Sequence, residues 1–418
     1  MPASRTLLLL ASLLTATPSS ATEFVPDWAG VTFDPLLPVD PAWVANPVLS
    51  WLSIPDLPTR FVADPFLFRG EDRWWLFFEL VPPYSSQGVI AVASSLFGAH
   101  WEFDRVVLET PEHLSYPLVF RWGEFYYLVP CVLGTDVVRL YRATAAEFPY
   151  TWSFASEILR GRHFADPTIF RHADRWWLTV SDISSESLAL YSSDDLEDPT
   201  HWHEHPASPV VAVDRSRARP AGRVQNLGGR LIRLAQRCDR DYGELVRAFE
   251  ITTLDEEHYA EVELRESPVL VPGGAPWNAF RMHQLDPWWT GERWLCAVDG
   301  YDGQRWSIGI YTDDLSDPTA AAAAAAQPGG LALDCAGWRG GAPLLLRCTC
   351  PAAAPATLAL YGVSGRRLRS EQLPAGAGSC ELRWDPVDGA GRPLPTGLYL
   401  LALRAAGHTV QRKVLLLR

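Results

Sequence analysis

The segment Asp64-Pro-Phe-Leu-Phe-Arg-Gly-Glu-Asp-Arg-Trp-Trp-Leu76 recurs farther along the chain as Asp166-Pro-Thr-Ile-Phe-Arg-His-Ala-Asp-Arg-Trp-Trp-Leu178. Between them lies Tyr116-Pro-Leu-Val-Phe-Arg-Trp-Gly-Glu-Phe-Tyr-Tyr-Leu128, which sets a period of about fifty residues. Each copy predicts a short strand, a turn that contains Gly or Asp, and a second strand rich in aromatic residues. A period of this length is typical of repeat architectures such as propellers.

Two looser copies follow. One begins at Arg219-Pro-Ala-Gly-Arg223, and the other runs from His283 through Trp288-Trp289. After each copy we expect a third strand, at 89–94, 137–142, 188–192, 245–251 and 308–312, and a fourth strand that begins near an aromatic residue in the first four repeats. Four strands repeated five times predict an all-β fold, a five-bladed β-propeller, which protects its sheet edges by radial repetition.

The fifth repeat has no fourth strand of its own. Asn46-Pro-Val-Leu49 resembles Ser208-Pro-Val-Val211 and Ser267-Pro-Val-Leu270, which end the fourth strands of two other repeats. We therefore expect residues 43–49 to pair with the last blade and close the ring.

The chain divides into five predicted regions. Residues 1–21 are typical of a secretory signal peptide, with Arg5 before an apolar stretch and small residues at its end. A lead-in (22–42), the propeller (43–318), an Ala/Gly/Pro linker (319–330) and a small antiparallel β-sandwich (331–418) follow. No later apolar run is long enough to span a bilayer, so we expect a secreted or cell-surface protein without a transmembrane segment.

Composition excludes several function classes. The 36 basic residues include a single lysine, Lys413, which excludes P-loop, Schiff-base and kinase-type lysine chemistry in the main body. The formal net charge of −13 argues against nucleic acid as a partner, since phosphate binding needs a basic face. Of the seven cysteines, Cys131, Cys238 and Cys296 are predicted to be buried free thiols. The other four cluster near the C-terminus and allow three disulfide connectivities: Cys335, Cys348, Cys350 and Cys380.

Several short motifs carry a resemblance to known families. Phe61-Val-Ala-Asp-Pro-Phe66, Ala218-Arg-Pro-Ala-Gly-Arg223 and Met282-His283 resemble the five-bladed propeller of glycoside hydrolase family forty-three and, more closely, the N-terminal propeller of plant glucosamine inositolphosphorylceramide transferases. The likeness covers about residues 43–316, and it leaves out the separate domain in which the plant proteins' transferase chemistry resides. Leu394-Pro-Thr-Gly-Leu-Tyr399 makes the C-terminal region similar to the immunoglobulin-like domains of flagellar-hook-capping proteins and of type-nine secretion sorting, which implies a contact with the cell surface or with secretion machinery.

The candidate site follows from the propeller geometry. First strands line the axis of a propeller, so the residues that begin them converge near one end. These are Asp64, Tyr116, Asp166, Arg219 and, in weaker register, His283. An Asp-Pro pair also suits a plain strand start, which is the alternative explanation for each aspartate.

The hydrolase resemblance implies a base at Asp64 and a pKa-tuning aspartate at Asp166. It also implies an acidic glutamate in the fourth blade, where this sequence has Arg219. Because arginine cannot donate a proton usefully near neutral pH, the usual hydrolytic mechanism lacks its acid, and Glu79 is the candidate substitute.

The remaining candidate residues are predicted to bind the ligand. Arg219 and Arg223, beside Gln236 and Tyr242, suit an anionic or hydroxyl-rich ligand such as a uronic acid; alternatively, the arginines neutralise buried aspartates. Tyr116 completes the set. His283 is expected to be a core or channel residue satisfied by backbone. In some relatives of this fold a histidine near the axis helps hold calcium or sodium through waters, but one histidine is not a metal site. No cofactor is expected apart from a structural calcium or sodium ion near the axis, which stays open.

Three functions stay open on these grounds. The first is a secreted glycoside-hydrolase-like enzyme that acts on a glycan or polysaccharide through Asp64 and Asp166. The second is a propeller that binds a glycan without catalysis, because Arg219 replaces the acid. The third is a structural or display protein with a vestigial site.

Overall fold

The computed structural model describes residues 38, 40–41, 44–54, 57–70, 73–95, 98–290, 293–313, 332–335, 338–339, 343–349, 356–362, 367–373, 379–405 and 408–417. The predicted signal peptide, most of the lead-in 22–42 and the linker 319–330 lie outside these residues, as does Cys350. No helix among the described residues is long and apolar enough to cross a membrane.

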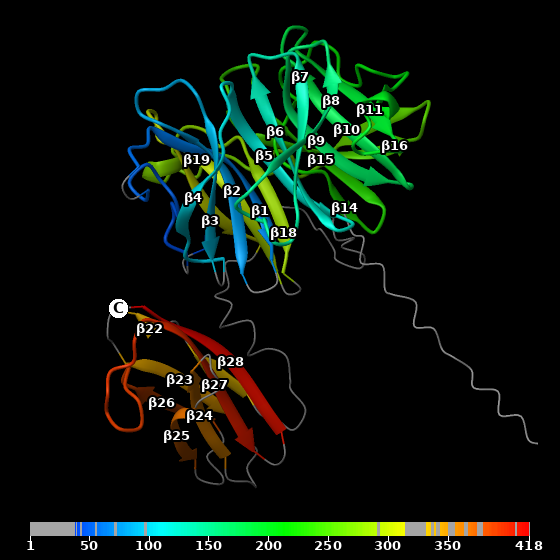
Figure 1. The fold of residues 1–418 in the computed structure, drawn as a ribbon. Coiled ribbons are helices and arrows are strands. Elements are labelled where there is room, and N and C mark those ends of the chain that lie inside the picture. Colours follow the sequence, from blue (N-terminus) through cyan, green and yellow to red (C-terminus); the bar gives the residue numbers. More distant parts are fainter. Residues whose placement is uncertain are drawn as a thin grey trace, which may run out of the picture.

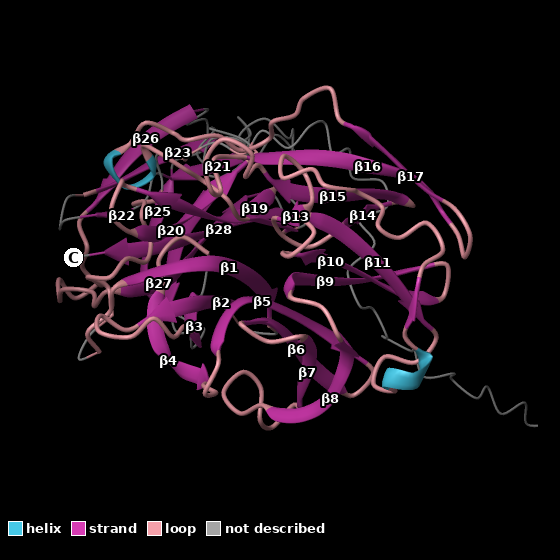
Figure 2. Cartoon of the chain, turned by 90° about the horizontal axis from the view of Figure 1, so that it is seen from above, coloured by secondary structure: helices cyan, strands magenta, loops and turns pink. Residues whose placement is uncertain are grey.

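Five successive sheets form the first part of the chain (Figure 1). Neighbouring strands in each sheet are antiparallel, and the first three sheets each have four strands in chain order. In Figure 2, β1, β5, β9 and β13 lie near the centre, whereas β4, β8 and β17 lie toward the outside. This arrangement confirms the predicted all-β propeller.

The strands of the five sheets have the following bounds. The first sheet holds β1 (Phe61–Arg69), β2 (Trp74–Val81), β3 (Val89–Ser95) and β4 (Glu102–Leu108). The second holds β5 (His113–Trp122), β6 (Phe125–Leu133), β7 (Val137–Ala143) and β8 (Ser153–Arg160). The third holds β9 (Phe164–His172), β10 (Arg175–Asp182), β11 (Ser187–Ser193) and β12 (His203–Glu204). The fourth holds β13 (Arg219–Pro220), β14 (Gln225–Leu227), β15 (Arg230–Gln236), β16 (Val246–Leu254) and β17 (Tyr259–Glu263). The fifth holds β18 (Leu285–Trp289), β19 (Trp294–Tyr301) and β20 (Trp306–Thr312).

The N-terminal segment pairs with the fifth sheet. Leu49 and Ile308 exchange two backbone hydrogen bonds, of 3.2 and 2.8 Å. The Asn46 side chain donates to the carbonyl of Ile310 and accepts from its N–H. The predicted closure by residues before the first strand is therefore confirmed for the described part of 43–49.

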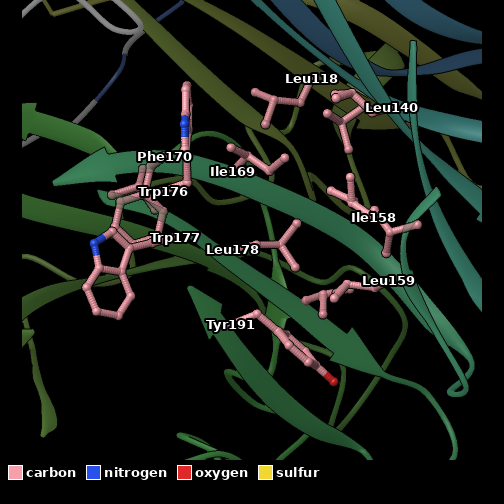
Figure 3. Close-up of a cluster of buried hydrophobic side chains, with 14 of the residues drawn as sticks. Leu118, Leu140, Ile158, Leu159, Ile169, Phe170, Trp176, Trp177, Leu178 and Tyr191 are labelled. Carbon is pink, nitrogen blue, oxygen red and sulfur yellow. The ribbon is translucent and has the colours of Figure 1, made fainter. Parts of the chain in front are cut away.

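The core consists of apolar residues between adjacent sheets. Figure 3 shows one such cluster, where Leu118, Leu140 and Ile158 of the second sheet face Ile169 and Leu178 of the third. The repeated tryptophans belong to this packing, since Trp176 and Trp177 are each only 2% exposed. Burial of side chains of this size contributes about 1.5–3 kcal/mol each, so the repeat is first of all a packing repeat. Cys131, Cys238 and Cys296 are buried free thiols, as predicted.

The C-terminal region forms two sheets. One contains β21 (Ala332–Cys335), β23 (Leu344–Thr349) and β26 (Ser379–Trp384). The other contains β22 (Trp338–Arg339), β28 (His408–Leu417), β27 (Gly397–Ala405), β24 (Ala356–Gly362) and β25 (Arg367–Leu373). Leu346 and Trp384 from the first sheet share a buried cluster with Leu358 and Leu401 from the second, so the sheets form a sandwich. The sandwich is not wholly antiparallel, because β22 runs parallel to β28.

Candidate functional site

Three sequence-equivalent residues share an unusual backbone conformation. Asp64, Tyr116 and Asp166 have φ values of 52°, 48° and 54°, and each precedes a proline. Each also lies at a break in register within the pairing of the first and second strands of its sheet. A non-glycine residue at positive φ costs about 1–3 kcal/mol, and such residues concentrate at functional sites. The three side chains are thus turned out of the strand pattern, which places their polar groups near the axis.

Two side chains of the fourth sheet donate hydrogen bonds to Asp166. Nε of Arg219 donates to its Oδ2 over 2.5 Å, and Nε2 of Gln236 donates to the same atom over 3.2 Å. The Asp166 side chain is 1% exposed, whereas that of Arg219 is 21% exposed. The pair therefore joins a buried carboxylate to a cation that reaches the surface. Arg219, which replaces the expected acid, is the counterion of Asp166.

Asp64 lies in a buried group with His283 and Asp299. Nε2 of His283 is 3.7 Å from Oδ1 of Asp64, and Nδ1 is 2.7 Å from Oδ2 of Asp299. Burial raises the pKa of Asp64 to about 8; His283 opposes this shift, while the charges of Glu79 and Asp166 add to it. Burial disfavours the charged form of His283, but the carboxylates of Asp299 and Asp64 outweigh it and raise the pKa of the ring. Asp64 and His283 therefore both hold a proton more tightly than the free side chains do.

His283 differs from its expected role. Its backbone N–H donates to Oδ1 of Asp299 over 3.0 Å, but its ring lies between two carboxylates and stacks on Trp306 at 3.9 Å between ring centroids. The expectation of a histidine satisfied by backbone is therefore wrong, because the ring's charged neighbours come from β1 and β19.

Glu79 forms a second acid–histidine pair. Its Oε1 lies 2.9 Å from Nε2 of His113, and both side chains are largely buried. Burial disfavours protonation of His113, but the hydrogen bond and charge of Glu79 outweigh it and raise the pKa of the ring. Because Glu79 is the cross-strand partner of Ala63, it lies beside Asp64. Glu79 thus belongs to the same cluster, but it is already paired.

Two predicted ligand-binding residues are structural instead. The hydroxyl of Tyr116 accepts from Gly222 N over 2.8 Å, donates to Gly222 O over 3.1 Å, and lies 2.9 Å from Oγ1 of Thr168. Arg223 donates through Nε and Nη2 to the buried carboxylate of Asp286, and Nη2 also donates to the carbonyl of Leu67. Both side chains are buried and engaged within the protein, so the predicted role of Arg223 as a ligand clamp is corrected. The alternative reading, an arginine that neutralises a buried acid, holds for both arginines, although the acid paired with Arg223 was not foreseen.

Tyr242 marks the surface side of the cluster. It is 40% exposed. The guanidinium carbon of Arg219 lies 5.0 Å from its ring centroid, and the ring meets the edge of His283 at 5.5 Å. Arg219 and Tyr242 are therefore the predicted site residues that a ligand can reach directly. Gln236 is buried and donates a hydrogen bond to Asp166. We call Asp64, Glu79, Asp166, Arg219, His283 and Asp299 the axial cluster.

Sequence reasoning missed Asp299, His113 and Asp286. A signal for Asp299 was present in the sequence. Glu79, Gln236 and Asp299 each stand six positions after an arginine that lies at, or directly before, the start of the second strand of their repeat: Arg73, Arg230 and Arg293. His113 and Asp286 lie in strands that lack such a marker, and only the fold brings them to their partners.

The donor atoms do not fit a calcium ion. Asp64, His283 and Asp299 are the described group that could hold a metal. Oδ1 of Asp299 accepts from the N–H groups of His283 and Gln284, and its Oδ2 accepts from Asp64 N. Oδ2 of Asp64 accepts from Tyr116 N. One carboxylate oxygen and one imidazole nitrogen remain, whereas calcium takes six to eight oxygen ligands.

The propeller region matches a known family. Residues 39–301 match the sequence profile described as the N-terminal region of glucosamine inositolphosphorylceramide transferase 1. The chain belongs to this family. It is 35% identical over 272 residues to glucosamine inositolphosphorylceramide transferase 1 of Oryza sativa subsp. japonica, which covers 62% of this chain and 36% of the rice protein. The Arabidopsis thaliana transferase is also 35% identical, over 258 residues that make up 33% of its length. The chain thus spans about a third of these relatives, as expected for their N-terminal propeller.

Solved structures share the propeller fold. A putative glycoside hydrolase of Parabacteroides distasonis matches 67% of this chain and 97% of its own with a TM-score of 0.52 at 12% identity. The β-1,2-mannobiose phosphorylase of Listeria innocua, solved with β-1,2-mannobiose, matches 65% and 95% with the same TM-score at 10% identity. At these identities the likeness establishes the fold. The family match and the structural likeness together make this chain a propeller protein of that family.

Proposed function

We propose that the end of the propeller that carries the axial cluster binds a glycan, and that Arg219 contacts an acidic group on it. The observation that carries this proposal is the pairing of Arg219. Its Nε is used by Asp166, and no hydrogen bond to another described residue engages Nη1 or Nη2. The guanidinium of a side chain that is 21% exposed, with Nη1 and Nη2 not used by the described residues, is suited to recognition of a carboxylate or phosphate.

The relatives support the choice of a glycan over other anions. The family is named for a glucosamine transferase, and a neighbour of the same fold was solved with a disaccharide. The plant proteins are about three times longer than the matched region, so a binding role for their N-terminal propeller is compatible with chemistry elsewhere in those chains.

A glycan array tests the proposal. We expect the purified full chain to bind glycans that contain uronic acid or phosphate, and Arg219→Ala to lose this binding. Arg230→Ala is the matched control, because Arg230 pairs with Glu250 on the outer part of the fourth sheet. Absence of glycan binding by the wild-type chain would leave a structural or display role.

Glycoside hydrolysis is a second candidate, favoured by the raised pKa of Asp64 and by the second acid, Glu79, beside it. For this reaction a sugar has to reach past Arg219 and Tyr242 to Asp64, whose raised pKa suits it to protonate the leaving group. The base expected from the hydrolase resemblance would then have to be another carboxylate. Glu79 lies beside Asp64 and is the candidate. Inverting hydrolysis requires two carboxyl groups in these roles, about 6.5–9.5 Å apart with room for a water between them. A sugar-release screen with wild type, Asp64→Asn and Glu79→Gln decides this: release that survives both substitutions excludes these acids.

We also propose that the protein is exported and that its C-terminal sandwich contacts the cell surface or the secretion machinery. The composition of residues 1–21 supports export. Fractionation of cells that express the chain with and without residues 1–21 tests this, and equal retention of both forms inside the cell would contradict it.

A further inference from the structure

We infer that the glycan site is extended. A second contact point at Trp51 and Arg305 binds a sugar ring at a distance from the axial cluster, so the ligand is an oligosaccharide that lies over the fourth and fifth sheets. This inference rests on the proposed glycan-binding function and specifies the size and path of the ligand.

Exposed apolar side chains gather at one end of the propeller. Of the eleven large apolar residues that are exposed among the described residues, eight lie in segments that precede a first strand or connect a second strand to a third. Because neighbouring strands are antiparallel, all of these segments lie at the end where Asp64 and Asp166 begin their strands. The eight are Trp51, Leu52, Tyr84, Ile183, Val213, Tyr242, Val271 and Phe280. An apolar rim around a charged centre suits sugars, which present both hydroxyl groups and apolar faces.

A series of ring and guanidinium contacts runs from Arg219 as far as Trp306. The Arg219 guanidinium packs on Tyr242, Tyr242 meets His283, and His283 stacks on Trp306. Arg305 precedes Trp306 in the chain, and its guanidinium carbon lies 4.0 Å from the ring centroid of Trp51. The series thus ends one residue along the chain from the arginine that packs on Trp51, whose side chain is 39% exposed.

The turn that carries Arg305, whose guanidinium packs on Trp51, is held in place. Residues 302–305 form a tight turn in which Oδ1 of Asp302 accepts from the N–H groups of Gln304 and Arg305. Phe280 packs against the other side of the turn, because a Cβ on Gly303 would lie 3.1 Å from its ring. One face of Trp51 is therefore covered by a cation from a fixed turn, and the exposed surface of the ring is available to a sugar. Side chains ordered before binding lose less entropy on binding.

The exposed aromatic residue of the first sheet lacks such support. Tyr84 is fully exposed at 103%, and it enters none of the ring or cation contacts found among the described residues. Trp51 and Tyr242 are instead exposed rings with a guanidinium against one face. This asymmetry places the ligand over the fourth and fifth sheets and away from the first.

Calorimetric titration with oligogalacturonides of one to six residues tests the inference, with neutral xylo-oligosaccharides of the same lengths as the second series. For wild type we expect the affinity to rise with the number of rings until Trp51 is reached. Trp51→Ala should weaken binding of the longest oligogalacturonide about tenfold, which corresponds to about 1.4 kcal/mol. The affinity for the shortest oligogalacturonide that wild type binds should stay the same. Leu52→Ala is the matched control, since Leu52 is the neighbouring exposed residue at 74%.

The outcomes separate the two proposals. Affinity that depends on Arg219 but not on chain length, or a Trp51→Ala variant that binds all lengths as wild type does, overturns the extended site and leaves the glycan-binding function intact. Failure of wild type to bind any acidic or neutral oligosaccharide overturns both. A wild-type dimer that Trp51→Ala converts to a monomer, with unchanged glycan affinity, would assign the Trp51 surface to a contact between protein chains.

Discussion

The Nε atom of Arg219 lies 2.5 Å from Oδ2 of Asp166, and each residue stands where the first strand of its repeat begins. The hydrolase resemblance implied an acidic residue at the position of Arg219. The substitution changes the chemistry of the site, because a carboxyl group that could give up a proton is replaced by a cation that binds its neighbour.

Removal of Arg219 should destabilise the propeller. Arg219→Ala leaves the buried carboxylate of Asp166 with Gln236 as its remaining side-chain donor, and loss of one partner of a buried ion pair costs about 3 kcal/mol. Denaturant unfolding followed by tryptophan fluorescence measures this loss. In a double-mutant cycle with Asp166→Asn, strict additivity of the two changes would show that the residues do not interact.

The stability of the wild-type protein should fall as pH rises from about 4 to 8. The folded pKa of Asp64 is about 8 and its ordinary value is 3.8, so the folded state binds the extra proton between these values. Its contribution is complete below the ordinary value and is lost as pH approaches 8, by at most about 1.4 kcal/mol per pH unit. The raised pKa of His283 acts in the same direction. Asp64→Asn should flatten this part of the profile, and an unchanged slope in the variant would exclude Asp64 as the source.

Glu79→Gln should lower the pKa of His113. The carboxylate of Glu79, at 2.9 Å, outweighs the burial of the imidazole in the wild type, and an amide provides no charge to do so. Carbon-13 NMR titration of labelled histidines measures the shift. His201 is a suitable internal reference, since its own raised pKa comes from Asp194 on the surface. A His113 pKa that stays the same in the variant would contradict the pairing.

Tyr116→Phe should destabilise the protein without altering glycan binding. The substitution removes the acceptor of the Gly222 N–H, which then stays buried without its hydrogen bond at a cost of about 1–3 kcal/mol. Tyr84→Phe, at an exposed position, serves as the control and should have no effect. A loss of glycan affinity at full stability would return Tyr116 to the ligand-binding residues.

Calcium should not stabilise the protein. In the group formed by Asp64, His283 and Asp299, one carboxylate oxygen is without a backbone donor, and the raised pKa of Asp64 opposes the loss of a proton that binding an ion there requires. We expect equal unfolding temperatures in millimolar calcium chloride and in chelator. A clear rise with calcium would show that the site takes up the ion and releases the Asp64 proton, and our reading of the donor set would then be wrong.

The sequence predicted the parts of the site that the repeat itself encodes. Asp64, Tyr116 and Asp166 occupy one position in three copies, and the structure gives them one backbone conformation. Which of these three residues faces a ligand depends on the side chains from other sheets that contact it. The sequence alone does not tell which side chains form those contacts. Arg223 and Arg219 are four residues apart, yet one turns into the core to meet Asp286 and the other remains partly exposed beside Tyr242. His113 lies one residue before the motif Leu114-Ser-Tyr-Pro117, and only the packing of the second sheet against the first brings it to Glu79.

The pairing of Leu49 with Ile308 has a consequence for how this unit can be excised or rearranged. The family match ends at residue 301, before β20, so a fragment cut at that boundary would discard the strand that Leu49 and Asn46 bind. A self-sufficient fragment has to begin before Asn46 and continue through Thr312. Because its two termini then meet on a single sheet, the same unit is suited to circular permutation or to insertion as a module into a loop of another protein.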